Sequence, residues 1–271
     1  MSEEAAPWSG GPVTARAHCV LEPNPGPMTL DGTNTWVLLE PGSSEAVVLD
    51  PGEEDEPHLR AVLDHVEARG ARVALTLLTH HHHDHAAGAP RFAALTGAPT
   101  RAVGAGHDDL ADGDVVTVGG LELRVVATPG HTADSVSFAL PADHALLTGD
   151  TVLGRGTTVV AHPDGELGAY LDSLDRLAAL TGDGGATTIL PGHGPRVPDA
   201  AAMVAFYRVH RQERLEQVRQ ALADGAATEE DPVEGVLRRV YAEVPREVWP
   251  AARMSVRAQL DHLGVAWTPR G

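Results

Sequence analysis

The sequence predicts an α/β protein with a small helical region at its C-terminal end, and three observations support this class. Several apolar runs have the length of buried strands, end in loops rich in Gly, Pro and His, and precede segments with helical spacing. Between two such β–α units lies a series of short strand-like runs. From residue 198 onward the apolar residues recur mainly at helical spacing.

The predicted elements place helices between strands. In the first half they are strands over 36–39 and 46–49, a helix over 57–69, a strand over 73–78 and a helix ending near Gly97. Next come short strands near 99–103, 114–118, 121–127, 134–140 and 144–148, then a helix over 166–180 and a strand over 187–190. Turn-forming residues such as Asp50-Pro51-Gly52 separate them.

The chain is expected to divide into a larger domain over 1–197 and a C-terminal domain over 198–271. DNA binding through Arg246, Arg253 and Arg257 is not favoured, because residues 201–271 carry as many acidic residues as Arg. We expect the C-terminal domain to wall a substrate cleft or to support a dimer. The pattern that predicts a small winged-helix-like unit here is a set of helices over 199–223, 233–244 and 245–263 with an extended segment over 264–267.

Composition sets ordinary limits on the protein. Its 271 residues are 42% hydrophobic, which is enough for one large core or one core with an appendage. A single cysteine, Cys19, excludes an internal disulfide, and no apolar run has the length of a membrane span. We therefore expect a cytoplasmic protein. The net charge of −18 disfavours broad electrostatic attraction to nucleic acid.

A motif rich in metal ligands follows the predicted strand 73–78. Residues 79–85 have the sequence THHHHDH, which gives the pattern HxHxDH from His80 to His85. Four nitrogen and oxygen ligands within six residues exceed what one tetrahedral zinc ion takes from so short a segment. An affinity tag would sit at a terminus, and a solvated His-rich tract would not be accompanied by further ligands elsewhere.

Three further candidate ligands follow other strand-like runs. They are His131 in TPGHT, Asp150 in LTGD and His193 in LPGHG. The small residues beside them allow the backbone to turn sharply and to approach a metal closely. Seven ligands at the ends of four strands predict a site for two metal ions.

With these residues the sequence resembles the metallo-β-lactamase superfamily, whose five motifs it contains in order. The resemblance implies an αβ/βα four-layer sandwich with two Zn²⁺ ions at one edge, although iron or manganese would also suit such a site. In the β-lactamases of this fold a cysteine occupies the place of Asp150, so antibiotic hydrolysis is not expected as the primary activity. By position, the first metal would be held by His80, His82 and His131 and the second by Asp84, His85 and His193, with Asp150 between them.

Within the superfamily, the chain resembles the β-lactamase-like protein 2 group over nearly its whole length. The matching stretches include 32–35, 149–158, 207–211 and 244–263. Animal members of that group resemble endoribonucleases acting on single-stranded RNA, and fungal relatives resemble thioesterases.

The expected function is therefore that of a dinuclear zinc-dependent hydrolase. A hydroxide bridging the metals would attack a phosphodiester or acyl bond, and Asp84 would be the catalytic proton carrier. The first expectation is an endoribonuclease on single-stranded RNA. The alternatives are a thioesterase or another acyl hydrolase acting on an ester, a lactone or a glyoxalase II-like substrate.

Two further classes remain open at this point. A mononuclear iron oxygenase of the same fold could use His80, His131 and Asp150 as its metal triad. A non-catalytic binding protein would use its C-terminal domain for a partner or a nucleic acid. The substrate is expected to be anionic or an acyl compound, the protein a monomer or a homodimer, and the candidate substrate-binding residues are Thr157, Thr158, His210 and Arg211.

Overall fold

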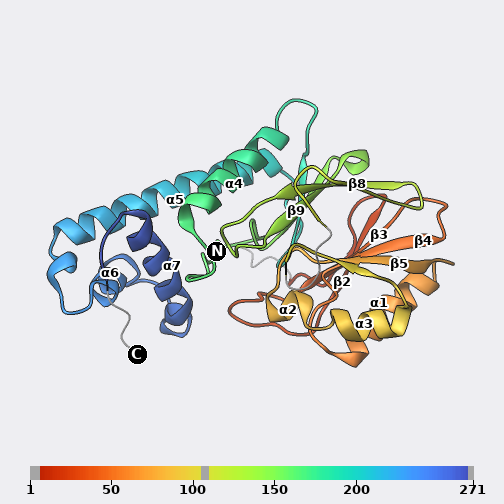
Figure 1. Cartoon of the computed structure of the whole chain (residues 1–271), viewed down its shortest axis with the longest axis horizontal. Coiled ribbons are helices and arrows are strands. Elements are labelled where there is room, and N and C mark those ends of the chain that lie inside the picture. Colours follow the sequence, from red (N-terminus) through yellow and green to blue (C-terminus); the bar gives the residue numbers. More distant parts are fainter. Residues whose placement is uncertain (1–6, 105–109, 268–271) are drawn as a thin grey trace.

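The computed structural model describes residues 7–104 and 110–267. These residues form two β-sheets with helices on their outer faces and a group of helices set to one side (Figure 1). None of the described helices is long and apolar enough to cross a membrane.

The first sheet contains six strands in sequence order. β1 to β4 pair antiparallel, whereas β4, β5 and β6 pair parallel. The parallel pairs require crossover connections, and α1 (Glu56–Glu67) and α3 (Ala89–Thr96) supply them. The strands are β1 (Gly11–Pro12), β2 (Ala17–Leu21), β3 (Asn34–Leu39), β4 (Glu45–Leu49), β5 (Arg72–Leu77) and β6 (Thr100–Arg101).

The second sheet has five strands in the order β11-β10-β9-β8-β7. All its pairs are antiparallel except β10 with β11, which are connected through α4 (Leu167–Leu180). The strands are β7 (Val115–Val118), β8 (Leu121–Ala127), β9 (Val136–Leu140), β10 (Ala145–Gly149) and β11 (Thr188–Pro191), and a short helix, η1 (Pro141–Asp143), joins β9 to β10.

Side chains point alternately to the two faces of each strand, and this alternation produces the layers. In β4, Val47 and Leu49 point toward the second sheet, whereas Ala46 and Val48 pack against α1 and α3. Phe138 of β9 lies in the core between the sheets and is fully buried. The outer face of the second sheet packs against α4 and α5 (Ala200–Ala223). The expected four-layer sandwich of two helix layers and two sheets is therefore confirmed.

The long helix α5 connects the sandwich to the C-terminal helices. Val204 and Tyr207 near its start pack in the outer core of the second sheet, and Val218 and Ala221 near its end pack in a separate cluster. That cluster also contains side chains of α6 and α7. The C-terminal elements are η2 (Ala226–Thr228), α6 (Pro232–Val240), η3 (Arg246–Val248) and α7 (Trp249–His262). The expected boundary at residue 198 thus falls just before a helix shared by both cores.

Several expectations for the C-terminal region need correction. The helix expected over 233–244 ends at Val240, and the helix expected over 245–263 begins with η3 before α7. Pro250 lies in the first turn of α7, where its missing N–H costs no helical hydrogen bond. The segment 264–267, expected to be extended, forms no strand with any described residue, because its neighbours are helices that offer no free strand edge.

The three arginines considered for DNA binding are engaged within the C-terminal helices. Arg253 pairs with Glu234, Arg246 stacks on Trp249, and Arg257 lies over Trp267. These contacts agree with the expectation that this region does not use them for DNA.

Replacing Phe138 with Ala should destabilise the protein by about 3–5 kcal/mol, because the vacated volume lies between two sheets that cannot close around it. Urea unfolding followed by circular dichroism measures the change. Val115→Ala on β7, where the side chain is 50% exposed, serves as the control and should change the free energy of unfolding by less than about 0.5 kcal/mol. Equal effects of the two substitutions would contradict the assignment of the core.

Candidate metal centre

The structure brings all seven predicted ligands together at one edge of the two sheets. The HxHxDH motif follows β5 and includes the single turn α2 (His83–Ala86). The other three residues follow β8, β10 and β11 of the second sheet. The site therefore lies where the two sheets meet, and each sheet contributes ligands.

Three histidines form the first cluster. The His82 Nδ1 atom lies 3.1 Å from His80 Nε2 and 3.0 Å from His131 Nε2. His80 and His131 are buried and His82 is half-buried. Three nitrogen atoms at this mutual spacing could hold one metal ion.

Asp84, His85 and His193 form the second cluster. The His193 Nε2 atom lies 3.2 Å from His85 Nε2 and 3.2 Å from Asp84 Oδ2. His85 Nε2 lies 3.5 Å from the same oxygen. This set of two nitrogens and one oxygen could hold a second ion.

Asp150 lies between the two clusters. Its Oδ2 atom is 3.3 Å from His193 Nε2 and 3.7 Å from His131 Nε2, and its Oδ1 atom is 3.4 Å from His85 Nε2. Oδ1 is buried and accepts no hydrogen bond from any described residue. A buried carboxylate oxygen without a donor is costly, and a cation would offset that cost. The donor set therefore fits a pair of divalent ions with Asp150 between them.

Glycine beside the ligands permits this close approach. A Cβ atom on Gly192 would lie 2.4 Å from Asp150 Oδ1 and 2.8 Å from Cε1 of His85, which is closer than real side chains come. Any larger residue would therefore push the loop after β11 away from the two ligands.

Asp50 organises the site but was not predicted as a site residue. It follows β4 with a positive φ of 52° and is buried. Its Oδ1 atom accepts a hydrogen bond from the Thr79 backbone N–H at 2.7 Å, and its Oδ2 atom accepts one from the Thr79 hydroxyl at 2.7 Å. Oδ2 also lies 2.9 Å from His85 Nδ1. In the sequence, Asp50 stands at the end of a predicted strand. Because Pro51 and Gly52 follow it, it could not be distinguished from an ordinary turn residue.

Other contacts orient the remaining imidazoles. The His131 Nδ1–H group donates to the Val159 carbonyl at 2.6 Å, which leaves Nε2 free to face the cluster. His193 Nδ1 lies 3.2 Å from the Gly32 carbonyl and is held in the same way. His81, within the motif, instead pairs with Asp134 at 2.9 Å.

Burial and the two carboxylates divide the imidazole pKa values into two groups. Burial and neighbouring histidines lower the pKa of His80, and burial followed by His131 lowers that of His82 to about 4. Burial also lowers the pKa of His193, but the charge of Asp150 and hydrogen bonds to Asp150 and Asp84 outweigh it and raise that pKa to about 9. The same carboxylates raise the pKa of His85. Burial therefore favours neutral imidazoles in the first cluster, whereas the carboxylates favour a protonated imidazole in the second.

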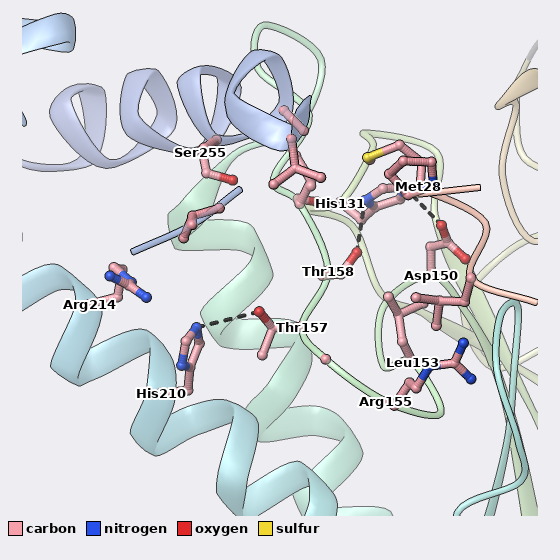
Figure 2. Close-up of a pocket in the computed structure, with 18 of the residues that line it drawn as sticks. Met28, His131, Asp150, Leu153, Arg155, Thr157, Thr158, His210, Arg214 and Ser255 are labelled. Atoms are coloured by element: carbon pink, nitrogen blue, oxygen red, sulfur yellow. Dashed lines mark hydrogen bonds and ion pairs between the residues drawn. The ribbon is translucent and has the colours of Figure 1, made fainter. Parts of the chain in front are cut away.

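A cavity of about 300 Å³ opens beside this centre (Figure 2). His131 and Asp150 lie at one end of it, and residues of α5 and the C-terminal helices form the opposite wall. The C-terminal region therefore walls the cleft. The apolar side chains that line the cavity are Pro27, Met28, Leu30, Leu153, Val159, Val244, Val248, Ala251 and Ala252.

The four candidate substrate-binding residues all line this cavity, but they differ in accessibility. Thr157 Oγ1 lies 3.5 Å from His210 Nε2, and both residues are half-buried. Thr158 is buried, with its hydroxyl 3.3 Å from His131 Nδ1. Arg211 is 5% exposed, donates from Nη2 to the Thr158 carbonyl at 2.5 Å and lies over the Tyr170 ring. Arg211 therefore also braces the loop that holds His131.

A four-layer sandwich with clustered His and Asp side chains at one edge defines a class of metal-binding hydrolases. The profile of the family described as "Metallo-beta-lactamase superfamily" matches residues 28–109 and 104–193. The chain belongs to the metallo-beta-lactamase superfamily, and it is a hydrolase of that fold, which implies binding of divalent metal. A second profile, "Beta-lactamase associated winged helix domain", matches residues 233–264 and confirms the expected type of C-terminal unit.

The chain is similar to curated proteins over most of its length. It is 33% identical over 264 residues to the beta-lactamase-like protein 2 homolog of Drosophila melanogaster, covering 90% of this chain and 86% of that protein. It is 34% identical over 250 residues to an atrochrysone carboxyl ACP thioesterase of Aspergillus chevalieri, covering 87% and 76%. Among solved structures, a metallo-beta-lactamase family protein from Thermus thermophilus is 25% identical, with a TM-score of 0.70 and coverage of 92% and 93%.

Replacing Asp50 with Asn should weaken zinc affinity by about 10–100-fold, because an amide cannot accept from both Thr79 and His85 on the same pair of oxygens. Competition with a chromophoric chelator measures the affinity. Asp64→Asn, at an exposed position of α1, is the matched control and should retain the native affinity. If Asp50→Asn bound zinc as tightly as Asp64→Asn, Asp50 would not be needed to orient the ligands.

Zinc binding to the metal-free protein should release protons and should strengthen as the pH rises from neutral toward about 9. The pKa of His193 is raised, so its protonated form is favoured below about pH 9 and is lost above it. A metal needs the unprotonated nitrogen, and competition from the proton therefore fades as the pH rises. Calorimetry in buffers of different ionisation enthalpy measures the release. An affinity that does not change over this range would contradict the prediction.

Proposed function

We propose that the protein is a dinuclear metal-dependent hydrolase of acyl bonds, with thioesters as its first substrate class. The observation that carries this proposal is the apolar cavity that ends at His131 and Asp150. A carbonyl placed at that end would have its hydrocarbon arm in contact with apolar side chains. The relatives named as thioesterases support the same substrate class.

In this proposal all seven predicted residues are metal ligands. His80, His82 and His131 would hold one ion, Asp84, His85 and His193 the other, and Asp150 would contact both. Zinc suits this mixture of imidazole nitrogen and carboxylate oxygen, and manganese or iron would also be accepted by it. When bound, the two ions would supply a nucleophilic hydroxide near neutral pH and a positive charge for the substrate oxygen.

The chain's own residues would handle the proton and the substrate. Asp84 is partly exposed, and its pKa is about 2 because His85 and the hydrogen bond from His193 outweigh the effect of burial. It is therefore ionised at neutral pH and can take a proton from the attacking water. Transfer of that proton to the departing sulfur completes hydrolysis to a carboxylic acid and a thiol. The apolar cavity wall would exclude competing water from the acyl arm.

Single-stranded RNA, the first expectation from the sequence, is the second candidate. The cationic side chains that line the cavity favour it, because phosphate would bind to them. Two features rank it lower. The net charge of the chain is −18, and Tyr241 is the one Phe, Tyr or Trp among the described residues that line the cavity, whereas proteins that bind single strands stack bases on several rings.

The mononuclear oxygenase alternative fits less well. It would use His80, His131 and Asp150 and would leave Asp84, His85 and His193 without a role, although these three also cluster within ligand distance. Cytoplasmic location and the choice between monomer and homodimer remain predictions.

The zinc-loaded protein should hydrolyse a hexanoyl thioester of N-acetylcysteamine, and His82→Ala should lose both activity and about one equivalent of zinc. His81→Ala is the matched control from the same motif, because His81 pairs with Asp134 outside both clusters. Asp84→Asn should lower kcat by about 10²–10⁴-fold. Thiol release measured with a chromogenic disulfide gives the rates, and metal analysis gives the occupancy.

End-labelled single-stranded RNA is assayed beside the thioester. Cleavage of RNA by the native protein, absent in His82→Ala, together with no thiol release, would replace the acyl proposal with the ribonuclease. One iron per chain with oxygen uptake would instead support the oxygenase.

A further inference from the structure

The α5 wall of the cavity carries positive charge that the sandwich does not neutralise. Arg211 and Arg214 lie on α5, three residues apart and therefore on the same side of the helix, and both line the cavity. Neither forms an ion pair with a carboxylate in the described part of the chain. In Figure 2, Arg214 and Asp150 lie at opposite ends of the pocket.

Arg211 and Arg214 differ from Arg155, the third arginine of the cavity, because they have no carboxylate partner in the described part of the chain. Arg155 also lines the pocket, but its guanidinium pairs with Asp31. Arg211 is 95% buried, yet its charge is met only by the Thr158 carbonyl and the Tyr170 ring among the described residues. A buried cation without an anion is costly, and a bound anion would offset that cost.

Arg214 is positioned to receive such an anion. Its Nη1 atom donates to the Val240 carbonyl at 2.7 Å and to Gln217 Oε1 at 2.9 Å, and its guanidinium lies over the Tyr241 ring. These contacts fix the plane of the group and engage Nη1 only. The Nε and Nη2 groups form one of the two edges of the guanidinium that can bind a carboxylate or phosphate through two parallel hydrogen bonds.

No carboxylate lines this end of the cavity in the described part of the chain, although Asp224 and Glu243 lie with Arg214 around a neighbouring pocket. Asp150 is the one acidic residue among the described residues that line the cavity, and it lies at the metal centre. His210, which precedes Arg211 and lies one helical turn before Arg214 on α5, has its pKa lowered to about 4 by burial and then by the charges of those two arginines. It is therefore neutral at neutral pH and can accept or donate a hydrogen bond without adding charge.

We propose that Arg211 and Arg214 form an anion subsite, so that the preferred substrate is a thioester whose cavity-bound arm is apolar and ends in a carboxylate or phosphate. This inference rests on the proposed acyl hydrolysis. The apolar walls would contact the middle of the arm, and the anion would bind beside Arg214, at the end opposite the scissile carbonyl. The anionic group can belong to the acyl side or to the thiol side, and the two sources are separated by experiment.

The test compares three thioesters of similar length on the zinc-loaded protein. Hexanoyl-N-acetylcysteamine is neutral, adipoyl-N-acetylcysteamine carries a carboxylate on the acyl arm, and the hexanoyl thioester of 3-mercaptopropionate carries one on the thiol arm. The native protein should show a kcat/KM about 10–100-fold higher for one of the anionic compounds than for the neutral one. Arg214→Gln should remove most of that ratio, and Arg214→Lys should restore part of it.

Arg219→Gln is the matched control, because Arg219 is an exposed residue of α5 that pairs with Glu216 and does not line the cavity. It should keep the native preference. Equal kcat/KM values for the three thioesters in the native protein would overturn the subsite even if every variant failed to fold. An unchanged ratio in a folded Arg214→Gln protein would overturn it as well.

A binding measurement tests the anion subsite even if the protein does not hydrolyse thioesters. Calorimetry compares adipate with hexanoate, each of which has one carboxylate for the metal centre, whereas only adipate has a second. About tenfold tighter binding of adipate, lost in Arg214→Gln, supports the subsite even if no thioester is hydrolysed. Equal binding of the two acids overturns it.

Discussion

The carboxylate of Asp50 is the contact on which the arrangement of the metal-binding residues depends. It lies at the end of β4, beside β5, and binds both the first residue of the THHHHDH segment and the imidazole of His85. The parallel pairing of β4 with β5 brings the two strand ends to the same edge of the first sheet. The positive φ of Asp50 is the local strain that accompanies this placement.

A second constraint comes from α5, which ties the metal-binding edge to the C-terminal helices. The Tyr207 hydroxyl oxygen accepts a hydrogen bond from the Leu153 N–H at 2.9 Å, and Arg211 holds the Thr158 carbonyl one turn further along. The loop between Asp150 and Val159 is therefore positioned by the same helix that continues into the C-terminal core. The cavity shape and the ligand geometry consequently depend on one another through a single rigid element.

The clustered residues could be predicted from the sequence for a physical reason, whereas the four-layer sandwich was implied by the resemblance to the superfamily. Each predicted ligand follows an apolar strand and stands beside small turn residues, so its position is encoded within a few neighbouring residues. The structure brings His80, Asp150 and His193 together as that pattern indicated. The polar group that orients His131 is the Val159 backbone carbonyl. Every residue has a backbone carbonyl, so the sequence could not indicate this contact.

The cavity could not be predicted in the same way. Its walls come from the loop before β3, the segment after Asp150, α5 and the C-terminal helices, which are far apart in the sequence. Arg211 was considered only as a substrate contact, because its second role depends on a loop that folds back toward α5. The brief strand expected over 264–267 does not form, because the apolar pattern of four residues does not distinguish a strand from a chain packed against helices.

The position of the metal-binding residues across two sheets has a mechanical consequence. Asp84 and His85 follow the first sheet and His193 follows the second, so an ion held by all three would cross-link the two halves of the sandwich. The chain has one cysteine and cannot make such a link through sulfur. A tightly bound ion at this edge would act as a reversible cross-link. The stability that it adds to the fold would depend on the concentration of free metal in the surroundings and not on their redox state.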